Sequence, residues 1–284
     1  MILLVDDQVS QMQLKKNLLK CLLAVSLVFG FLLQPAVAME ERQIETRGYI
    51  LNIKIERGSK SDLPIILLEA GGGGDSTQWT ILQPRLAAET GATVVSYDRP
   101  GYGKSPLPDK PYDIVTETEA FHAALVQLGF AKKVLPVGHS YGGFLIQLYA
   151  NRWPESVKGL LFLDPNNPSA MLAMGDDANQ KPVTNPVTPR DRANARVDAA
   201  GRAPFAAVYA ASLPQKVPVI VVSAEKPPFP KPRQIEIFRL SHELLAASVA
   251  DGKRVVAERS NHMVPAQRPD LVIACVQELL AKPN

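Results

Sequence analysis

Residues 133–146 read Lys133-Val134-Leu135-Pro136-Val137-Gly138-His139-Ser140-Tyr141-Gly142-Gly143-Phe144-Leu145-Ile146. The apolar residues at 133–137 predict a buried strand, and the apolar residues that follow Gly143 predict the start of a helix. Between them lies Ser140, flanked by small residues that let the backbone turn sharply and leave the hydroxyl exposed. We therefore predict that Ser140 is a nucleophile. A Gly-x-Ser-x-Gly sequence placed by chance in a loop is the alternative, and the strand-to-helix context disfavours it.

Similar apolar runs recur on both sides of this stretch, and longer helical patterns separate them. We expect an opening antiparallel hairpin at 46–56, strands at 64–68, 93–97, 133–137, 158–163, 218–223 and 254–258, and helices at 79–89, 115–128, 143–152, 234–249 and 269–281. Strands this apolar are buried on both faces. The alternation therefore predicts an α/β fold with a mostly parallel central sheet flanked by helices.

Residues 166–216 interrupt the alternation, because they hold many Pro, Asn, Asp, Arg and Ala and carry no strand pattern. Segments of that length inside a compact domain are usually lids or binding segments. Apolar residues such as Met171, Met174, Phe205 and Tyr209 favour a segment that packs over the domain. We predict a small helical cap inserted before the penultimate strand, and a disordered surface insertion is the alternative.

The first 38 residues have the composition of a secretory signal peptide. Three lysines precede an apolar run at 21–33, and small residues follow it up to Ala38. The run is too short for a comfortable membrane span, so we predict cleavage after Ala38. The chain would then be a signal peptide followed by one domain at 39–284, exported to the periplasm or secreted, with no stable membrane association. An uncleaved N-terminal anchor is the alternative, and the start at Met1 or Met12 is left open.

Composition and charge favour a small-molecule substrate. Of the 284 residues, 46% are hydrophobic and 21% are charged, which is ordinary for a globular protein. The net charge is only +3 and the basic residues form no tract, which argues against nucleic acid as a partner. No group of His, Cys, Asp and Glu has metal-ligand spacing, and we expect neither a metal nor a cofactor. Cys275 lies in an apolar helical pattern, which predicts a buried, unreactive thiol. The oligomeric state is left open.

A nucleophilic serine requires a general base, and the chain has four histidines. His262 follows the last expected strand and precedes the final helix, so it lies at the same edge of the sheet as Ser140. His122 and His242 fall within helical patterns, and His139 is held in the turn beside the serine. His262 is therefore the predicted base, which takes the hydroxyl proton and returns it to the leaving group.

Three further stretches accompany the serine, namely the glycine-rich run at 68–74, the segment 96–105, and the late pair Asn261-His262. Together with Ser140 they resemble the α/β-hydrolase superfamily, whose chain order is serine, acid, histidine. The resemblance covers nearly all of the chain after residue 38 except the cap. It implies the α/β-hydrolase fold but limits the reaction only broadly, because that scaffold hosts esterases, lipases, amidases, peptidases, haloperoxidases and lyases.

The glycine run can bring bare backbone N–H groups close to an oxyanion. The resemblance implies an oxyanion hole formed by the N–H of Tyr141 and one from Gly71 or Gly72. The usual histidine-glycine start of this loop is replaced here by Glu69-Ala70, which leaves the register open by one residue. A phosphate-binding loop is the rival interpretation, but no Gly-Lys-Ser/Thr follows the glycines.

The resemblance also implies an acid that orients the histidine. In many relatives the acid follows the strand expected at 218–223, where this chain continues with Glu225. The preceding strand ends at Asp164, a position that some members of the superfamily use. Asp164 is the first choice and Glu225 the alternative. Asp98 and Arg99 are expected to tie together the turn after their own strand.

The sequence therefore predicts a carboxylesterase-like serine hydrolase that cleaves an ester or related acyl bond through an acyl-enzyme. Ser140, His262 and Asp164 would form the catalytic triad. The alternatives are a cofactor-free haloperoxidase or lyase on the same scaffold, and an inactive binding protein that retains the serine turn. The identity of the substrate is left open, because the cap carries no recognisable motif.

Overall fold

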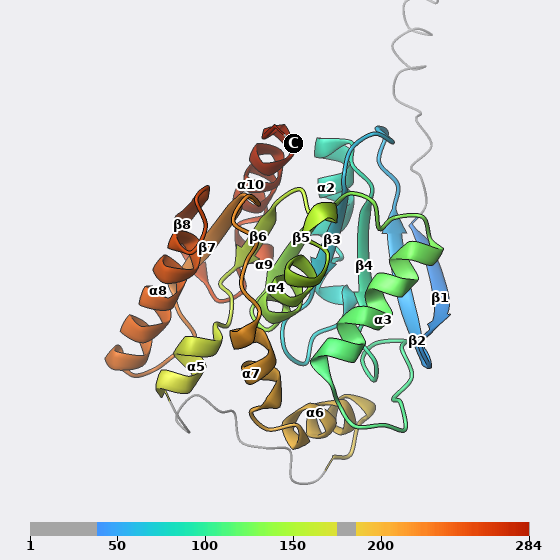
Figure 1. The fold of residues 1–284 in the computed structure, drawn as a ribbon, viewed down its shortest axis with the longest axis horizontal. Coiled ribbons are helices and arrows are strands. Elements are labelled where there is room, and N and C mark those ends of the chain that lie inside the picture. Colours follow the sequence, from blue (N-terminus) through green and yellow to red (C-terminus); the bar gives the residue numbers. More distant parts are fainter. Residues whose placement is uncertain (1–38, 175–185, 284) are drawn as a thin grey trace, which may run out of the picture. The chain divides into compact units, whose positions relative to one another are not determined.

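The computed structural model describes residues 39–174 and 186–283, so the predicted signal peptide lies outside the described residues. Their centre is an eight-stranded sheet in the order β1-β2-β4-β3-β5-β6-β7-β8 (Figure 1). The strands are β1 (Glu40–Thr46), β2 (Tyr49–Glu56), β3 (Ile65–Glu69), β4 (Val94–Asp98), β5 (Val134–His139), β6 (Leu160–Leu163), β7 (Val219–Lys226) and β8 (Gly252–Asn261). Strands β3 to β8 run parallel, whereas β2 is antiparallel to both of its neighbours.

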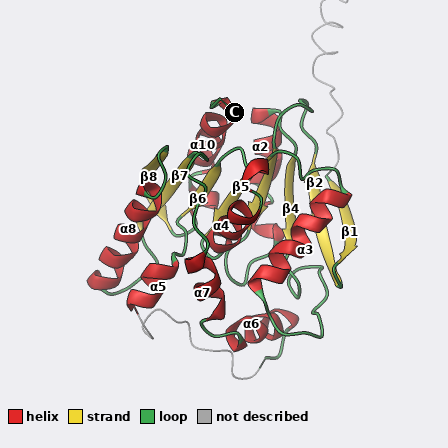
Figure 2. Ribbon diagram, viewed as in Figure 1, coloured by secondary structure: helices red, strands yellow, loops and turns green. Residues whose placement is uncertain are grey.

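Helices cover both faces of this sheet (Figure 2). They are η1 (Ser76–Trp79), α2 (Leu82–Thr90), α3 (Ile114–Gln127), α4 (Gly142–Arg152), η2 (Pro154–Ser156), α5 (Pro168–Met174), α6 (Pro189–Ala199), α7 (Ala203–Ala210), α8 (Pro232–Ala247), α9 (Val264–Gln267) and α10 (Pro269–Ala281). The predicted mostly parallel sheet flanked by helices is confirmed. None of the helices in the described part of the chain is long and apolar enough to cross a membrane.

Alternate side chains of each inner strand enter two separate cores. In β7, Val219 and Val221 pack with α3, α4 and α8, while Ile220 and Val222 pack with α2 and α10. Each such side chain, fully buried, stabilises the fold by about 1.5–3 kcal/mol. The sheet is therefore a rigid platform, and the loops after its parallel strands meet at one edge, where ligands bind in open α/β sheets.

The opening hairpin differs from the prediction. Residues 49–56 form only its second strand, and the first strand is β1, which pairs Thr46 with Tyr49 across a two-residue turn. Both turn residues, Arg47 and Gly48, have positive φ angles of 48° and 73°, as tight hairpins require. The predicted bounds were wrong because β1 is an edge strand of mostly charged and exposed residues, which show no apolar alternation.

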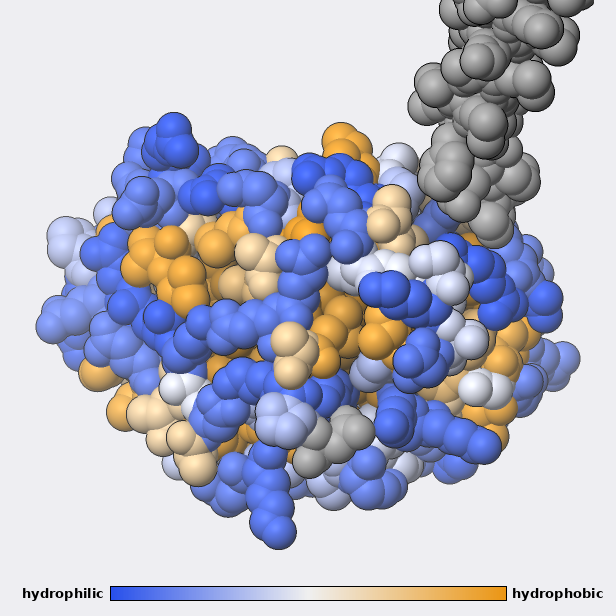
Figure 3. Space-filling model, turned by 90° about the horizontal axis from the view of Figure 1, so that it is seen from above, coloured by the Kyte–Doolittle hydropathy of each residue, from blue (hydrophilic) through white to orange (hydrophobic). Residues whose placement is uncertain are grey.

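The predicted helical cap before the penultimate strand is confirmed. Helices α5, α6 and α7 lie between β6 and β7, and no strand occurs in the described part of 166–216. The cap has its own apolar cluster, in which Met171, Met174 and Val208 pack against Phe144 of α4 and Phe238 of α8. Seen from the end of the molecule away from α6, the surface is mostly hydrophilic, with apolar residues in patches between the polar ones (Figure 3).

Candidate active site

Ser140 lies on a sharp turn between the end of β5 and the start of α4. Its φ angle of 52° is in the left-handed region, which L residues seldom adopt. The flanking positions must be glycine, because a side chain at either one would collide with neighbouring backbone atoms. A Cβ at Gly138 would lie 2.6 Å from the carbonyl oxygen of Gly142, and a Cβ at Gly142 would lie 2.4 Å from that of Glu69. The predicted strand, turn and helix around Ser140 are therefore present, and a close approach of backbones holds the turn.

His262 follows β8 directly and reaches the serine. Its Nε2 atom lies 2.9 Å from the Ser140 hydroxyl oxygen, and its Nδ1 atom lies 2.7 Å from Oδ2 of Asp164. The backbone around it is fixed by His139, whose Nε2–H donates to the His262 carbonyl at 2.7 Å. The structure thus brings together Ser140, His262 and Asp164, the three residues that the sequence singled out.

Asp164 directly follows β6 and is completely buried. Its Oδ1 atom accepts the N–H of Ala224 at 2.8 Å, which leaves Oδ2 to face His262. The alternative acid, Glu225, is exposed and accepts the N–H of Arg259 instead. Of the two carboxylates, the structure places Asp164 against the histidine.

The hydrogen bonds also fix the proton on His262. A carboxylate only accepts hydrogen bonds, so Nδ1 of His262 must carry the proton that it donates to Asp164. Its Nε2 atom is then a bare lone pair that faces the hydroxyl of Ser140. This is the tautomer in which an imidazole can take the proton of a serine.

The glycine loop after β3 is held from behind by Arg99. The buried guanidinium donates to the carbonyls of Ala70 at 2.6 Å and Gly71 at 2.5 Å. In a trans peptide the C=O and the following N–H point in opposite directions. The N–H of Gly71 is therefore turned away from Arg99, and the side chain of Gln78 accepts it at 3.1 Å. By the same geometry the N–H of Gly72 points away from Arg99.

The sequence left open whether the N–H of Gly71 or that of Gly72 faces the oxyanion, and this arrangement favours Gly72. Because Gln78 occupies the N–H of Gly71, Gly72 is the better placed of the two glycines to bind an oxyanion. Gly72 lies against Tyr141, since a Cβ on it would be 3.6 Å from the Tyr141 Cβ. Within the described residues, the N–H groups of Gly72 and Tyr141 have no hydrogen-bond partner.

Burial controls the charges around the glycine loop. It raises the pKa of Glu69 to about 7, although Arg99 lies 4.0 Å away and opposes the shift. Burial, and then the nearby His262, lower the pKa of His139 to about 4. His139 is therefore neutral at pH 7, and Arg99 is a fixed buried cation. Asp98 ties the turn after its own strand, as predicted, because it accepts the N–H of Lys104, and it also accepts the N–H of Ser76. The prediction for Arg99 was wrong, because its side chain binds the glycine loop after β3 instead.

Comparison with known proteins identifies the family. A family model described as "alpha/beta hydrolase fold" matches residues 64–219, which is more than half of the chain. The chain belongs to the α/β-hydrolase fold family. A (lyso)-N-acylphosphatidylethanolamine lipase of Mus musculus is 30% identical over 126 residues, which cover 43% of this α/β-hydrolase and 36% of the relative. The match thus spans little more than a third of that lipase.

Solved structures share the fold at low sequence identity. A membrane phospholipase A, described as a bacterial virulence factor, is 20% identical with a TM-score of 0.58, and the match covers 94% of this chain and 98% of the other. The haloalkane dehalogenase DatA of Agrobacterium tumefaciens C58 is 16% identical with a TM-score of 0.63, over 86% of this chain and 97% of the other. At these identities the likeness shows the fold alone.

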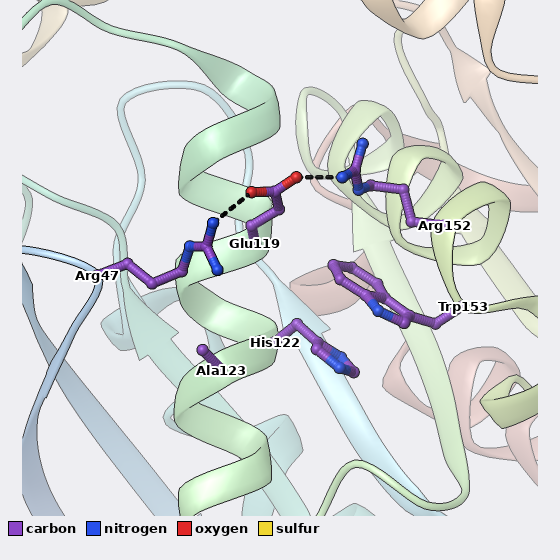
Figure 4. A pocket seen from close by; sticks show the side chains of 6 residues that line it. All are labelled: Arg47, Glu119, His122, Ala123, Arg152 and Trp153. Carbon is purple, nitrogen blue, oxygen red and sulfur yellow. Dashed lines mark hydrogen bonds and ion pairs between the residues drawn. The ribbon is translucent and has the colours of Figure 1, made fainter.

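A pocket of about 570 Å³ lies between α3 and the end of α4 of this α/β-hydrolase, and none of the residues that line it belongs to the triad (Figure 4). Its Glu119 carboxylate is shared by Arg47 and Arg152. There His122 stacks on Trp153 with ring centroids 3.7 Å apart. His122 therefore has the packing role that its helical position predicted.

Sequence reasoning missed several residues of the hydrolase site. Gln78 fixes the register of the glycine loop, and nothing in its local pattern indicates that contact. Asn194 of the cap helix α6 accepts from the Tyr102 hydroxyl at 2.9 Å, and a Cβ on Gly73 would lie 3.3 Å from its Oδ1 atom. The cap thus contacts the glycine loop itself. His242, read as a helix residue, lies beneath Asp164.

Proposed function

We propose that this α/β-hydrolase cleaves an ester or related acyl bond of a small molecule through an acyl-enzyme on Ser140. The observation that carries the proposal is the unbroken chain of hydrogen bonds from Asp164 through His262 to Ser140. It ends beside two backbone N–H groups, of Gly72 and Tyr141, that have no partner within the described residues. Nucleophile, base, orienting acid and oxyanion donors are the complete set that acyl transfer needs.

The proposed reaction begins with attack of the Ser140 oxygen on the acyl carbon while His262 Nε2 takes the hydroxyl proton. The carbonyl oxygen becomes an oxyanion, which accepts the N–H groups of Gly72 and Tyr141. His262, now a cation stabilised by Asp164, returns the proton to the leaving alcohol, and the acyl group remains on Ser140. A water molecule then attacks the ester with His262 as base, which releases the acid and restores the serine.

A set of p-nitrophenyl esters with increasing acyl-chain length tests the proposal. We expect turnover of at least the short esters, and a fall in kcat/KM of about a thousandfold or more in Ser140→Ala, because a triad acts as a unit. Ser212→Ala is the matched control, since Ser212 is an exposed serine outside the site. Equal activity in wild type and Ser140→Ala would contradict the proposal. The profile over chain length would identify the acyl group that the cap admits.

Export is a separate proposal, because it rests on the sequence pattern of residues that the structure does not describe. We propose that the chain is exported and cleaved after Ala38. N-terminal sequencing of protein recovered outside the cytoplasm should then begin at Met39. A chain that retains residues 1–38 and stays in the membrane fraction would instead support the uncleaved anchor.

A further inference from the structure

A second histidine lies beneath the triad acid. His242 of α8 is completely buried, and its Nδ1 atom lies 4.0 Å from Oδ1 of Asp164. Its ring also packs on Phe238, with centroids 4.3 Å apart. The proposed reaction has no direct use for this buried, titratable histidine beside the triad acid. The hydrogen bonds of His242 indicate its role.

The direction of each hydrogen bond of His242 can be assigned. The Pro165 carbonyl only accepts, so His242 must carry a proton on Nε2, which lies 2.9 Å from it. On the other side, Arg254 Nε only donates, and it donates to the Ser223 hydroxyl oxygen at 2.9 Å. The Ser223 O–H is then free to donate to His242 Nδ1, also at 2.9 Å. The chain of donors runs from Arg254 through Ser223 and His242 to Pro165.

The surroundings keep His242 uncharged. Burial is the main effect, and it lowers the pKa of His242 below its ordinary value. The charged or titratable groups that face it are Asp164, which favours the cation, and Arg254 and His262, which disfavour it. Arg254 is itself paired with Glu243 at 3.2 Å. A neutral His242 does not compete with His262 for the negative charge of Asp164.

The carbonyl that His242 binds belongs to the turn that presents the acid. Asp164 has a φ angle of 43°, in the left-handed region, so its conformation must be held by its surroundings. Three consecutive residues are tied. The Asp164 N–H donates to the Val222 carbonyl, the Pro165 carbonyl accepts from His242, and the Asn166 N–H donates to the Ser140 carbonyl at 3.0 Å. Of these three backbone hydrogen bonds, the one to Pro165 is made by a side chain, that of His242.

We propose that His242 is a positioning residue for the triad acid, which holds the Asp164-Pro165 turn so that Oδ2 of Asp164 faces His262. The effect of His242 on the rate rests on the proposed function, whereas its effect on the position of Asp164 does not. His242 touches neither substrate nor the reacting atoms. It acts through Asp164, and so the strength of the Asp164–His262 hydrogen bond is the quantity that it controls.

Two replacements of His242 separate positioning from packing. His242→Phe keeps a ring of similar size but has no donor for the Pro165 carbonyl. We expect kcat for ester hydrolysis to fall about tenfold, the equivalent of about 1.4 kcal/mol in activation free energy, with KM unchanged. His242→Gln can place an N–H near the position of Nε2 and should recover most of the rate. His122→Phe, at the histidine stacked on Trp153, is the matched control and should behave as wild type.

Two properties of His262, the pH profile of kcat/KM and the NMR signal of its Nδ1 proton, would not change if the role of His242 were merely structural. In His242→Phe the acidic limb of the pH profile of kcat/KM should move to lower pH, because a loosened Asp164 stabilises the His262 cation less. The downfield NMR signal of the His262 Nδ1 proton should move upfield, and His242→Gln should restore it. A lower rate with unchanged pH profile and NMR signal would overturn the proposal, as would a folded His242→Phe with wild-type kinetics.

A second variant, Ser223→Ala, tests the proposal without replacing His242, and the NMR signal tests it without enzyme turnover. If His242→Phe does not fold, Ser223→Ala removes the hydroxyl that accepts from Arg254 Nε and donates to His242 Nδ1, and the same shift of the His262 signal, in smaller measure, is expected. An unchanged signal in folded Ser223→Ala would count against the proposal. The NMR signal needs no turnover, so a wild-type protein inactive on all esters would refute the proposed function while the effect of His242 on His262 is still measured.

Discussion

Replacing Asp164 by asparagine is an informative change because the structure decides which way the new amide faces. Asp164 Oδ1 accepts the Ala224 N–H at 2.8 Å, and Oδ2 faces His262 Nδ1 at 2.7 Å. In Asp164→Asn, an NH2 group turned toward Ala224 would leave two buried donors facing each other, at a cost of about 1–3 kcal/mol. The amide oxygen therefore stays on Ala224, and the NH2 group faces His262.

Facing a donor, Nδ1 of His262 can only accept, so its proton moves to Nε2. The nitrogen beside Ser140 then carries a proton and cannot take another from the serine. A wrong tautomer of this kind lowers kcat by about 10⁴ in serine proteases, and we expect a fall of about 10³ to 10⁴ here. That fall corresponds to about 4–5.5 kcal/mol in activation free energy.

The assay is steady-state hydrolysis of a p-nitrophenyl ester that the wild type turns over, together with thermal unfolding of each variant. Glu225→Gln is the matched control, because Glu225 lies near the carboxyl end of the neighbouring strand β7 and is exposed. We expect it to retain nearly full activity. The reasoning is refuted if folded Asp164→Asn stays within about tenfold of the wild type, and more so if Glu225→Gln loses activity instead.

Three further outcomes are expected. Arg99→Lys keeps the charge but replaces the rigid guanidinium, whose two nitrogens bind the carbonyls of Ala70 and Gly71, by a single nitrogen on a flexible stem. We therefore expect kcat to fall about 10- to 100-fold with KM unchanged in steady-state kinetics; an unchanged kcat would contradict the role of Arg99. Burial raises the pKa of Glu69 from 4.5 to about 7, so the native state holds a proton that the unfolded chain loses. That stabilisation, present below about pH 4.5, is lost as the pH rises through about 7, by at most about 3 kcal/mol. In urea unfolding at pH 5 and 8, Glu69→Gln should therefore lose less stability than the wild type, and equal losses would count against a raised pKa. Burial also raises the pKa of the Cys275 thiol to about 11, so iodoacetamide at pH 8 should modify Cys275 only after unfolding, as read by peptide mass mapping, and modification of the folded protein would refute its burial.

Features that depend on residues close together in the chain could be predicted from the sequence. The turn around Ser140 combines an apolar strand, two glycines and a helix start within a dozen residues, so no distant contact was needed to recognise it. His262 followed from its place after the last strand, since parallel strands end at one edge. The buried inner strands were recognisable because a strand that is covered on both faces is apolar along its whole length.

Features that depend on contacts between distant segments could not be predicted. Asp164 and Glu225 both stand at the carboxyl ends of neighbouring strands, and only the left-handed turn at Asp164 aims its carboxylate at His262. The register of the glycine loop depends on Arg99 from the next strand and on the side chain of Gln78. A buried histidine such as His242 has the same pattern on a helix as any packing residue.

Covalent capture of Ser140 tests the central claim most directly. A fluorophosphonate reacts with a serine only when a base and an oxyanion site activate it, so folded wild-type protein should gain one phosphonyl group, and peptide mapping should place it on Ser140. Heat-unfolded protein and Ser140→Ala should not react. Failure of the folded wild type to react, or modification of a different serine, would contradict the account of this chain as a serine hydrolase.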